Sequence, residues 1–562
     1  MTGTDRHSVD EAVAGLIDVA ALAASPVHGP GRRLRWTTAN VDEALPGILT
    51  PMTWSMYYPP TETTMRDCWV DLGVVPESER PIPDEVDGRF FATAYGHSIV
   101  NVDRTGQMAA RLPGGTSAAI EELLFGSVLG GGPPDPKGLA KLRRYPIVAA
   151  KLPIALRRAM KAHPRMAAET DRWWRRSVFD IDLRPADAAR TLVAARAHFV
   201  RVLTNHMILT MTGQGVFAQV EVAASRAGQP GLGNEVVKSD GGTSEFELVR
   251  DLWRLSKGTL QMEPFLRAHG YHGPREGLLE SVIWREDPSP VIELAAAYRS
   301  RRGLDDVEGL MVRRAGEQRA AMAKLESGLG SVGGRLARLL VGFASNVPEW
   351  RETGRAGILK SVDVARHAHR VLGRDLAERG LLDDPEHVRF LTIDEVEEFD
   401  RGLLDGQAIP GLVAQRQRDH AAFEQMDLPH VWRGVPDVTV RRSVGPSGAA
   451  AEVTELTGLA VSAGVAEGVV RVVLDLDAAD FWETDEPTVM VCKATDPSWA
   501  SVFPLAEAVV TDVGSQMSHA AIVCRELGLP CVANTRTGTQ QLRDGMRVRV
   551  DGNTGVVTVL TH

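Results

Sequence analysis

The stretch GSQMSHAAIVCREL, residues 514–527, contains the histidine on which the interpretation of this chain depends. Small and polar residues precede His519, and the apolar residues after it recur with helical spacing. A helix that begins near Ser518 has unpaired N–H groups and a positive dipole end at its first turn, which suits a phosphate. Gly514 allows a close approach or a positive φ in the preceding turn. Two hypotheses follow: a packed histidine at a helix end, or a nucleophile directed at a phosphoryl group.

Short β-branched runs surround this stretch and predict a small β-rich domain. The runs are GVVRVVLD, PTVMVCKA, AEAVVTD, RVRVDG and GVVTVL, each bounded by glycine, proline or aspartate. Only two helical pieces are expected among them, around SWASVFPLA and SHAAIVCREL. We predict a compact C-terminal domain over residues 456–562. A flexible linker is expected at residues 436–455, where proline, glycine and serine interrupt any periodicity.

A mostly helical region precedes this linker. Apolar residues recur three and four positions apart in PADAARTLVAARAHFVRVLTNHMILTMTGQGVF and in several later stretches, which predicts a helical domain over residues 32–435. Residues 1–31 are expected to form a tail or short helix that ends in the breaker cluster SPVHGPG. The stretch RWTTANVDEALPGILTPMTWSM, residues 35–56, is expected to be extended. The predicted fold is multidomain, with a large mostly α-helical domain followed by a small β-rich one.

Composition argues against several functional classes. The 562 residues carry a formal net charge of −10, which gives no overall field that would gather nucleic acid or an anionic membrane surface. Local basic groups, such as that of Arg143 and Arg144, are interpreted as solvated faces. The four cysteines are too few and too irregularly spaced for a disulfide framework or a zinc cluster, so no metal site is expected. With no signal peptide and no membrane-spanning run, we expect a soluble cytoplasmic protein.

Three stretches of the C-terminal part resemble a known family. TDVGSQMSHAAIVCRELGLPCVANT, DGMRVRVDGNTGVV and SAGVAEGVVRVV are similar to the swivelling phosphohistidine domain of phosphoenolpyruvate-utilising enzymes, such as pyruvate phosphate dikinase, phosphoenolpyruvate synthase and rifampin phosphotransferase. The resemblance implies a β/β/α swivelling phosphohistidine domain in which His519 accepts a phosphoryl group at one active site and carries it to another. Gly514, Ser515 and Ser518 would form the phosphate-binding turn. Ser515 departs from the family, which usually has a second glycine there.

The helical region also resembles this family, in segments that follow one another along the chain. RWTTANVDEALPGILTPMTWSM, FLRAHGYHGPREGLLESVIWREDP, WRETGR and LAERGLLDDPEHVRFLTIDEVEE are similar to the substrate-binding domain of rifampin phosphotransferase and related proteins. Those enzymes also carry a large ATP-grasp domain, and nothing before Trp36 could house one. The resemblance therefore implies that ATP and Mg are used through a separate ATP-grasp partner, as in phenylphosphate synthase. No tightly bound cofactor is expected.

The segment WRETGR contains candidates for holding the phosphoryl group. Arg351 and Arg355 lie four residues apart, so a helix places both guanidiniums on one face, with Glu352 beside them. Two such groups could clamp a phosphoryl group and neutralise its charge during transfer. The segment resembles a similarly basic one in the rifampin enzyme. The alternative is an exposed helical turn held by salt bridges.

The glycine-punctuated segment HGYHGPREG offers candidates for a general base. His269, His272, Arg275 and Glu276 lie within it, and an imidazole has a suitable pKa for removing a hydroxyl proton. His272 is the leading candidate, with His269 and Arg275 assigned to the substrate pocket. A purely structural turn is the alternative.

Aromatic and methionine side chains near the N-terminal part suit a pocket for an apolar alcohol or phenol. Trp54 and Met56 are the chosen candidates, although the same residues suit an ordinary core. Asn205 and His206 lie within a strongly apolar helix and are interpreted as a core pair that needs hydrogen-bond partners.

The leading hypothesis is a phosphotransferase. A separate ATP-grasp protein would charge His519, and the phosphoryl group would pass to a hydroxyl of a small apolar compound. Activation of that compound for dehydration is one net reaction that this transfer would allow. No nucleic acid or membrane partner is expected. The alternative is a non-catalytic protein that sequesters an apolar ligand and uses the C-terminal domain as a lid. Charging by phosphoenolpyruvate itself is a third hypothesis, which the absence of an alternating strand–helix series disfavours.

Overall fold

The computed structural model describes residues 34–38, 41, 45–112, 115–125, 128–138, 142–229, 232–237, 244–300, 307–436, 438–440, 454–474, 486–495, 497–514 and 518–561. The predicted tail at residues 1–31 and most of the predicted linker at residues 436–455 lie outside the described residues, as does Ser515.

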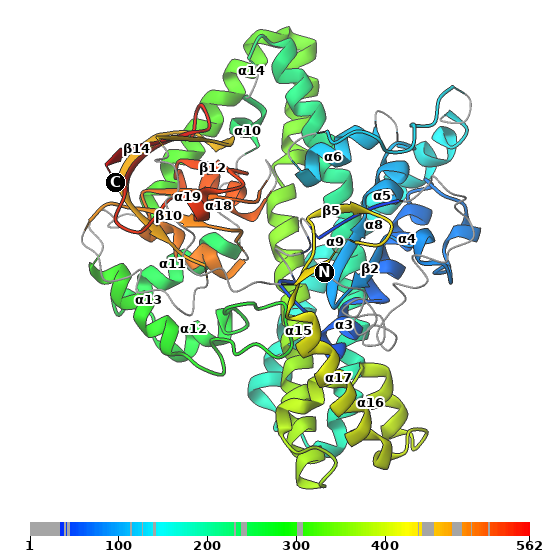
Figure 1. The fold of residues 1–562 in the computed structure, drawn as a ribbon. Coiled ribbons are helices and arrows are strands. Elements are labelled where there is room, and N and C mark those ends of the chain that lie inside the picture. The colour runs from blue at the N-terminus through cyan, green and yellow to red at the C-terminus, as the bar shows by residue number, and fades with distance from the viewer. Residues whose placement is uncertain are drawn as a thin grey trace.

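Two long helices, α9 (Pro185–Arg226) and α15 (Val347–Glu378), form the centre of the helical domain (Figure 1). They approach closely where glycines face the partner helix. A Cβ on Gly354 would lie 2.5 Å from His206 Nδ1, and one on Gly213 would lie 2.6 Å from Val347 Cγ1. Side chains from both helices, among them Phe199 and Leu359, share one core cluster. This pair is therefore the rigid frame of the domain.

Other helices pack around this pair. One of them, α8 (Tyr145–Arg175), is long, whereas α14 (Val307–Ala344) consists of two helices that meet at a kink at Gly330, where φ is 69° and ψ is −178°. The shorter ones are α3 (Pro51–Tyr57), α4 (Pro60–Asp71), α5 (Val102–Ala109), α6 (Ser117–Phe125), α10 (Leu232–Val236), α11 (Ser244–Ser256), α12 (Met262–His269), α13 (Ser289–Ser300), α16 (Ile393–Asp400) and α17 (Ile409–Phe423).

The helical domain also contains a four-stranded sheet that periodicity did not predict. Its order is β2-β3-β1-β5, and the strands are β1 (Arg35–Thr37), β2 (Phe91–Ala94), β3 (His97–Asn101) and β5 (Val431–Arg433). A separate strand pair joins β4 (Met426–Asp427) to β6 (Thr439–Val440). In the first sheet, Trp36 pairs with Asn101 on one side and with Trp432 on the other. The sheet thus joins the two ends of the helical domain.

The expectation of an extended chain over residues 35–56 is correct at β1 and wrong at α3. The helix forms because the Thr50 side chain accepts a hydrogen bond from the N–H of Thr53, and Pro51 stands at the first helical position, where no N–H is needed.

The C-terminal domain is built on an eight-stranded sheet with the order β7-β14-β13-β9-β10-β11-β12-β8. Its strands are β7 (Glu455–Thr457), β8 (Leu459–Ser462), β9 (Val465–Val472), β10 (Thr488–Cys492), β11 (Ala508–Thr511), β12 (Cys531–Ala533), β13 (Arg547–Asp551) and β14 (Val556–Thr561). The four strands from β9 to β12 run parallel, and their neighbours pair antiparallel. The predicted fold class, a large helical domain followed by a small β-containing one, is confirmed.

Helical segments connect these strands. They are the 3-10 turns η8 (Pro497–Ser501) and η9 (Phe503–Leu505) and the helices α18 (His519–Leu527) and α19 (Gly538–Gln541). The sequence predicted the first three as two helical pieces and missed the short α19.

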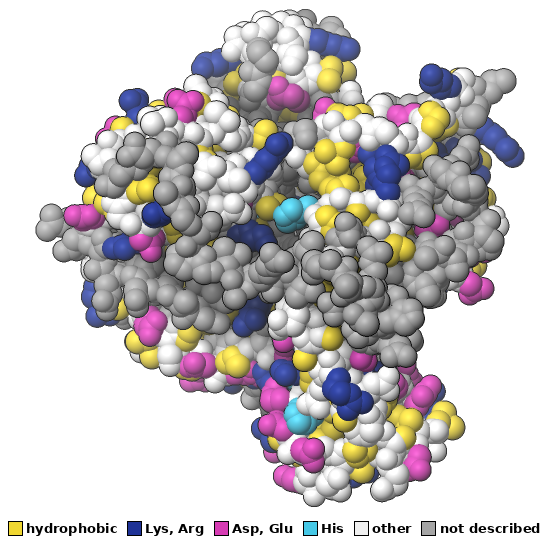
Figure 2. Space-filling model, viewed as in Figure 1, with side chains coloured by type: hydrophobic (Ala, Val, Ile, Leu, Met, Phe, Trp, Pro, Cys, Tyr) yellow, Lys and Arg dark blue, Asp and Glu magenta, His cyan; other side chains and the backbone are white. Residues whose placement is uncertain are grey.

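The C-terminal domain is docked on α11 and α13. Phe246 and Leu252 of α11 share a core cluster with Trp499 and Phe503 of the C-terminal domain. The Tyr298 hydroxyl of α13 donates a hydrogen bond to the Ser501 carbonyl at 2.8 Å. In this arrangement a hollow separates the two domains, and basic side chains and a histidine are visible in it (Figure 2). Among the helices of the described residues, none is long and apolar enough to span a bilayer.

Candidate active site

His519 is the first residue of α18, as the sequence predicted, and Ser518 occupies the N-cap position. Gly514 lies close to its neighbours. A Cβ on Gly514 would lie 3.0 Å from Ala533 Cβ and 3.2 Å from Ser518 Oγ, so glycine is favoured there for space rather than for a positive φ. The positive end of α18 adjoins the histidine ring.

The His519 ring is held from two sides and is 5% exposed. Its Nδ1 lies 3.4 Å from Thr495 Oγ1, and its plane stacks on Phe503 with ring centroids 6.1 Å apart. Nε2 is buried without a hydrogen-bond partner among the described residues. Nε2 is therefore the nitrogen that can act as a nucleophile. Sequence reasoning missed Thr495, whose only signal is its position just beyond a parallel strand, where ligands of α/β sheets usually bind.

Burial, and after it the positive charge of Arg355, hold the pKa of His519 well below its ordinary value. The imidazole is therefore neutral near pH 7. A neutral ring has the free lone pair that attack on phosphorus requires.

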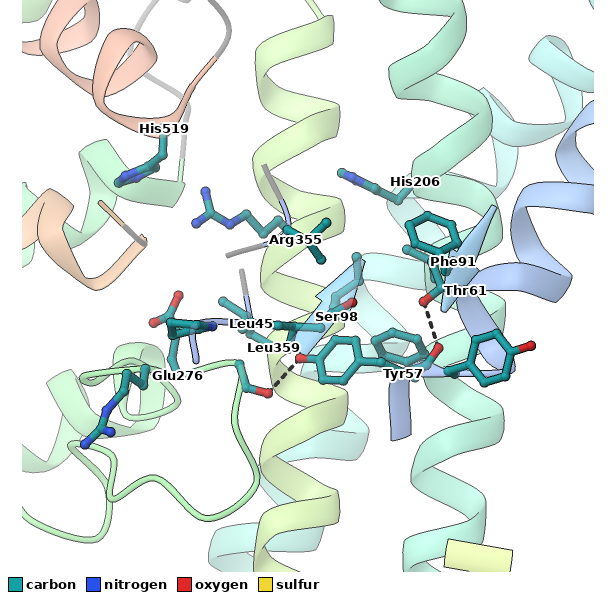
Figure 3. Close-up of a pocket in the computed structure, with 18 of the residues that line it drawn as sticks. Leu45, Tyr57, Thr61, Phe91, Ser98, His206, Glu276, Arg355, Leu359 and His519 are labelled. Carbon is teal, nitrogen blue, oxygen red and sulfur yellow. Dashed lines mark hydrogen bonds between the residues drawn. The ribbon is translucent and has the colours of Figure 1, made fainter. Parts of the chain in front are cut away.

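Arg351 and Arg355 project from α15 into the space between the domains, and Arg355 points towards His519 (Figure 3). Arg355 Nη1 lies 3.5 Å from Glu352 Oε2 and 3.6 Å from Glu245 Oε1. Arg351 Nε lies 3.7 Å from Glu352 Oε1. These arginines line the cavity beside His519, instead of forming the fully exposed turn that was the alternative.

Glu352 and Glu245 form a buried carboxyl pair beneath the arginines. Burial and the neighbouring Glu352 carboxylate raise the pKa of Glu245. Burial opposes ionisation of Glu352, but a hydrogen bond from Glu245 and the charges of Arg355 and Arg351 hold its pKa below the ordinary value. The pair therefore shares one proton, and Glu352 orients both guanidiniums rather than touching a ligand.

One cavity of about 350 Å³ connects His519 with both arginines. Its polar end is formed by His519, Thr495, Arg351, Arg355, His206 and Glu276. The rest is mainly apolar and includes Leu45, Trp54, Tyr57, Phe91, Phe199 and Leu359. Arg275 also lines it. Of the predicted pocket residues, Trp54 and Arg275 thus reach this cavity. Met56 does not, because it is fully buried in the core cluster that also contains Phe199 of α9.

His272 and Glu276 form a buried pair at the polar end. His272 Nδ1 lies 2.7 Å from Glu276 Oε2, and both residues are nearly inaccessible. Glu276 lines the cavity, whereas His272 lies behind it. Glu276 Oε1 has no hydrogen-bond partner within the described ranges. The geometry therefore favours Glu276 as the base and His272 as the residue that positions it, which departs from the prediction.

His269 faces a different cavity, of about 220 Å³, on the opposite side of α15. Its Nε2 lies 3.0 Å from Asp251 Oδ2, and Lys360 of α15 lines the same space. His269 is therefore not a wall of the cavity that contains His519, contrary to the prediction.

His206 was interpreted as a core residue but lines the cavity near the arginines (Figure 3). Burial, and after it Arg351, lower its pKa to about 4, so the ring is neutral. Asn205 behaves as predicted: its amide donates to the Ala159 carbonyl at 3.0 Å and its oxygen lies 3.3 Å from His163 Nδ1. The helical pattern of the sequence does not show that Asn205 lies in the core and His206 at the cavity, because tertiary packing decides which face of the helix meets the cavity.

The part of the chain that the structure describes contains no group of three or more His, Cys, Asp or Glu side chains that could hold a metal ion.

Comparison with known proteins agrees with this geometry. Residues 484–555 match the mobile domain of PEP-utilising enzymes. The chain is 37% identical over 197 residues to the uncharacterized phosphotransferase YvkC of Bacillus subtilis, a match that covers 34% of this chain and 23% of the relative. It is 34% identical over 215 residues to the rifampicin phosphotransferase of Streptomyces sviceus, covering 38% of this chain and 23% of the relative.

A longer and weaker match extends over more of the chain. The rifampicin phosphotransferase of Bacillus cereus is 25% identical over 338 residues, which are 58% of this chain and 36% of that protein. The chain thus spans only about a quarter to a third of the length of these relatives. Residues 484–555 of the C-terminal domain, which include His519 at the start of α18, are thus similar to the mobile domain of PEP-utilising enzymes.

Proposed function

We propose that this chain is a phosphotransferase component in which His519 carries a phosphoryl group and passes it to a hydroxyl of a small apolar compound. The observation that supports this most strongly is the shared cavity. A neutral, nucleophilic histidine, two guanidiniums and a carboxylate all meet one apolar space of about 350 Å³. A histidine with a purely structural role would not need two guanidiniums and a carboxylate beside it in one cavity.

The proposed transfer conserves atoms and charge. The hydroxyl oxygen attacks phosphorus, the P–O bond forms and the P–Nε2 bond of His519 breaks, which returns the ring to its neutral state. Glu276 takes the hydroxyl proton through Oε1, and His272 holds the other carboxylate oxygen at 2.7 Å. Arg351 and Arg355 balance the charge on the phosphoryl oxygens.

The cavity also limits the size of the acceptor. Because one water molecule occupies about 30 Å³ in the liquid, 350 Å³ accommodates roughly a dozen non-hydrogen atoms. An aromatic or branched aliphatic alcohol of that size fits, with its apolar body against Phe91 and Leu359 and its hydroxyl at the polar end.

The proposed source of the phosphoryl group is ATP, used with Mg by a separate ATP-grasp protein. This rests on the family resemblance. For such charging His519 must leave the cavity, since the docked ring is 5% exposed.

Charging can be tested without the partner by using phosphoramidate, a small phosphoryl donor for histidine. Wild type is expected to gain one acid-labile, base-stable phosphoryl group, and His519→Ala none. The matched control His387→Ala changes a histidine outside the cavity and should be labelled like wild type. Equal labelling of His519→Ala and wild type would rule out His519 as the carrier.

Transfer is tested separately on the charged protein with a panel of small alcohols, including benzyl alcohol and cyclohexylmethanol. An accepted alcohol is expected to remove the label and to appear as its phosphate ester by mass spectrometry. Glu276→Gln should still be charged but transfer about 100-fold more slowly. Absence of any label on wild type would instead support the lid hypothesis, in which the protein is not catalytic and the cavity only stores its ligand.

A further inference from the structure

We propose that the outer face of α8 binds an anionic lipid surface. This face is defined by Ile147, Ala150, Ile154, Arg157, Lys161 and Arg165 and is called the α8 face below. The proposal does not depend on the chemistry at His519.

Charge is distributed unevenly along this chain. Its formal net charge is −10, yet residues 142–168 contain seven basic side chains and not one aspartate or glutamate. An overall negative charge predicts repulsion from anionic surfaces, but binding depends on the local field within about 10 Å. The α8 face is therefore the place where this acidic protein can approach an anion-rich surface.

The basic side chains on the α8 face, and Arg158 beside it, are available to a partner. Arg157, Arg158, Lys161 and Arg165 are all exposed. None of the four forms an ion pair with another residue in the described part of the chain. Surface arginines elsewhere are often paired, as Arg401 is with Glu397 at 64% and 28% side-chain exposure. An unneutralised cluster of this kind raises the local positive potential.

Apolar side chains share this face. The residues that define it follow one another at spacings of three and four, so they lie on one side of the helix. Ile154 is 60% exposed and Ile147 is 38% exposed, and Leu142 just before the helix is 52% exposed. The opposite side, with Val148 and Ala159, is buried against the helical domain. Ile154 is therefore largely free of core contacts, whereas part of Ile147 also lies against Gly73.

The order along the helix suits a bilayer. The apolar residues occupy the first turns of α8 and the basic ones the later turns, with Ile147 and Ile154 about 10 Å apart along the axis. An apolar tip of this length can enter the region between headgroups and acyl chains while the basic residues contact the headgroups. The positive end of the helix dipole lies at the same tip.

An acidic protein is the competing partner, and the composition disfavours it. Protein interfaces are enriched in aromatic residues and arginine and depleted in lysine at their centre, and aromatic residues are prominent among their strongest contacts. The α8 face has lysine and arginine beside aliphatic residues and no aromatic one. A lipid surface also dissolves small apolar alcohols, the acceptor class proposed above.

The test is cosedimentation of the full chain with vesicles. Binding to vesicles of phosphatidylcholine and phosphatidylglycerol in equal amounts is expected, with little binding to phosphatidylcholine alone and loss of binding at about 0.5 M NaCl. Arg157→Gln/Lys161→Gln should weaken binding about 30-fold, because each basic residue near the surface contributes about 1 kcal/mol. Ile154→Gln should weaken it about tenfold.

Two controls make the result specific. Arg401→Gln/Leu403→Gln changes one basic and one exposed apolar residue near α16, and should bind like wild type; Leu403 is 74% exposed. His519→Ala should also bind like wild type, so failure of the phosphotransferase proposal would not affect this one. Unaltered circular dichroism checks that each variant folds. Absence of binding to the mixed vesicles, or unchanged binding by the α8 variants, would overturn the proposal.

Discussion

At the scale of a single residue, the positive charge of Arg355 lowers the pKa of His519. Burial is the larger cause of the low pKa of His519, and Arg355 is the next. Replacing Arg355 by glutamine should therefore raise that pKa, although not to its ordinary value. The protonated, unreactive fraction of the ring then grows at mildly acidic pH.

The expected result is an acid limb that moves to higher pH in the rate of phosphohistidine formation from phosphoramidate. Initial rates between about pH 4.5 and 8 would measure it. Arg351→Gln is the matched comparison and should shift the limb less, because Arg351 has a smaller effect on the pKa of His519. Identical profiles for wild type and Arg355→Gln would contradict this account.

His369 should make the helical domain sensitive to acid. It is fully buried, and burial, with Arg370 next, lowers its pKa to about 3. The unfolded chain protonates this histidine below about pH 6.5, whereas the folded chain does not, so stability falls as pH falls from there towards the folded pKa. Between pH 7 and pH 5 the loss is about 2 kcal/mol.

Urea unfolding of His369→Leu at both pH values would measure this contribution. Neither ring nitrogen has a hydrogen-bond partner among the described residues, so an apolar replacement removes no such bond. The variant should lose about 2 kcal/mol less than wild type on going to pH 5, and a wild-type-like loss would speak against the assignment. His387→Leu, at a partly exposed site, serves as the control.

At the scale of elements, the contact between α9 and α15 sets the shape of the cavity. Alanine usually stabilises a helix by up to about 1 kcal/mol relative to glycine. Gly354→Ala should instead destabilise the protein by about 1–3 kcal/mol, because the added Cβ would lie 2.5 Å from His206 Nδ1 and 3.1 Å from His206 Cβ.

Gly215→Ala is the matched control, since Gly215 is an exposed glycine of α9 with nothing within 4 Å of an added Cβ. Thermal unfolding should show opposite shifts for the two variants. Stabilisation by Gly354→Ala would mean that the helices can move apart at this contact.

Sequence patterns predicted the elements that local spacing controls. The long helix α9 and most strands of the C-terminal domain follow from periods of 3.6 and 2. The sheet containing β1 did not, because Arg35 pairs with Arg433, nearly the whole helical domain away, and strands of three residues leave little periodic signal. The cavity brings together segments that are distant in sequence, so sequence patterns predict only some of its residues. Arg355 and Trp54 are among those predicted, whereas His206 and Thr495 are recognisable as cavity residues only in the folded structure.

At the scale of the whole molecule, the docked arrangement depends on the interface of α11 and α13 with the C-terminal domain. Tyr298→Phe removes the hydrogen bond to the Ser501 carbonyl and should weaken docking by about 1 kcal/mol, which is about fivefold in the undocked population. Hydrogen exchange should rise at the amides of η8 and α13. Exchange in α9 and α15 is the internal control and should not change. Faster exchange throughout all four elements would indicate general destabilisation instead.

His519 and Thr495 form part of the cavity wall, so the cavity is complete only while the C-terminal domain is docked. A compound that fills it must bind the docked arrangement more tightly than the undocked one, and by thermodynamic reciprocity it holds the C-terminal domain in place. Under the proposed function, excess acceptor would therefore slow turnover, because it delays undocking of the unphosphorylated His519. Turnover would peak at an intermediate acceptor concentration and decline above it.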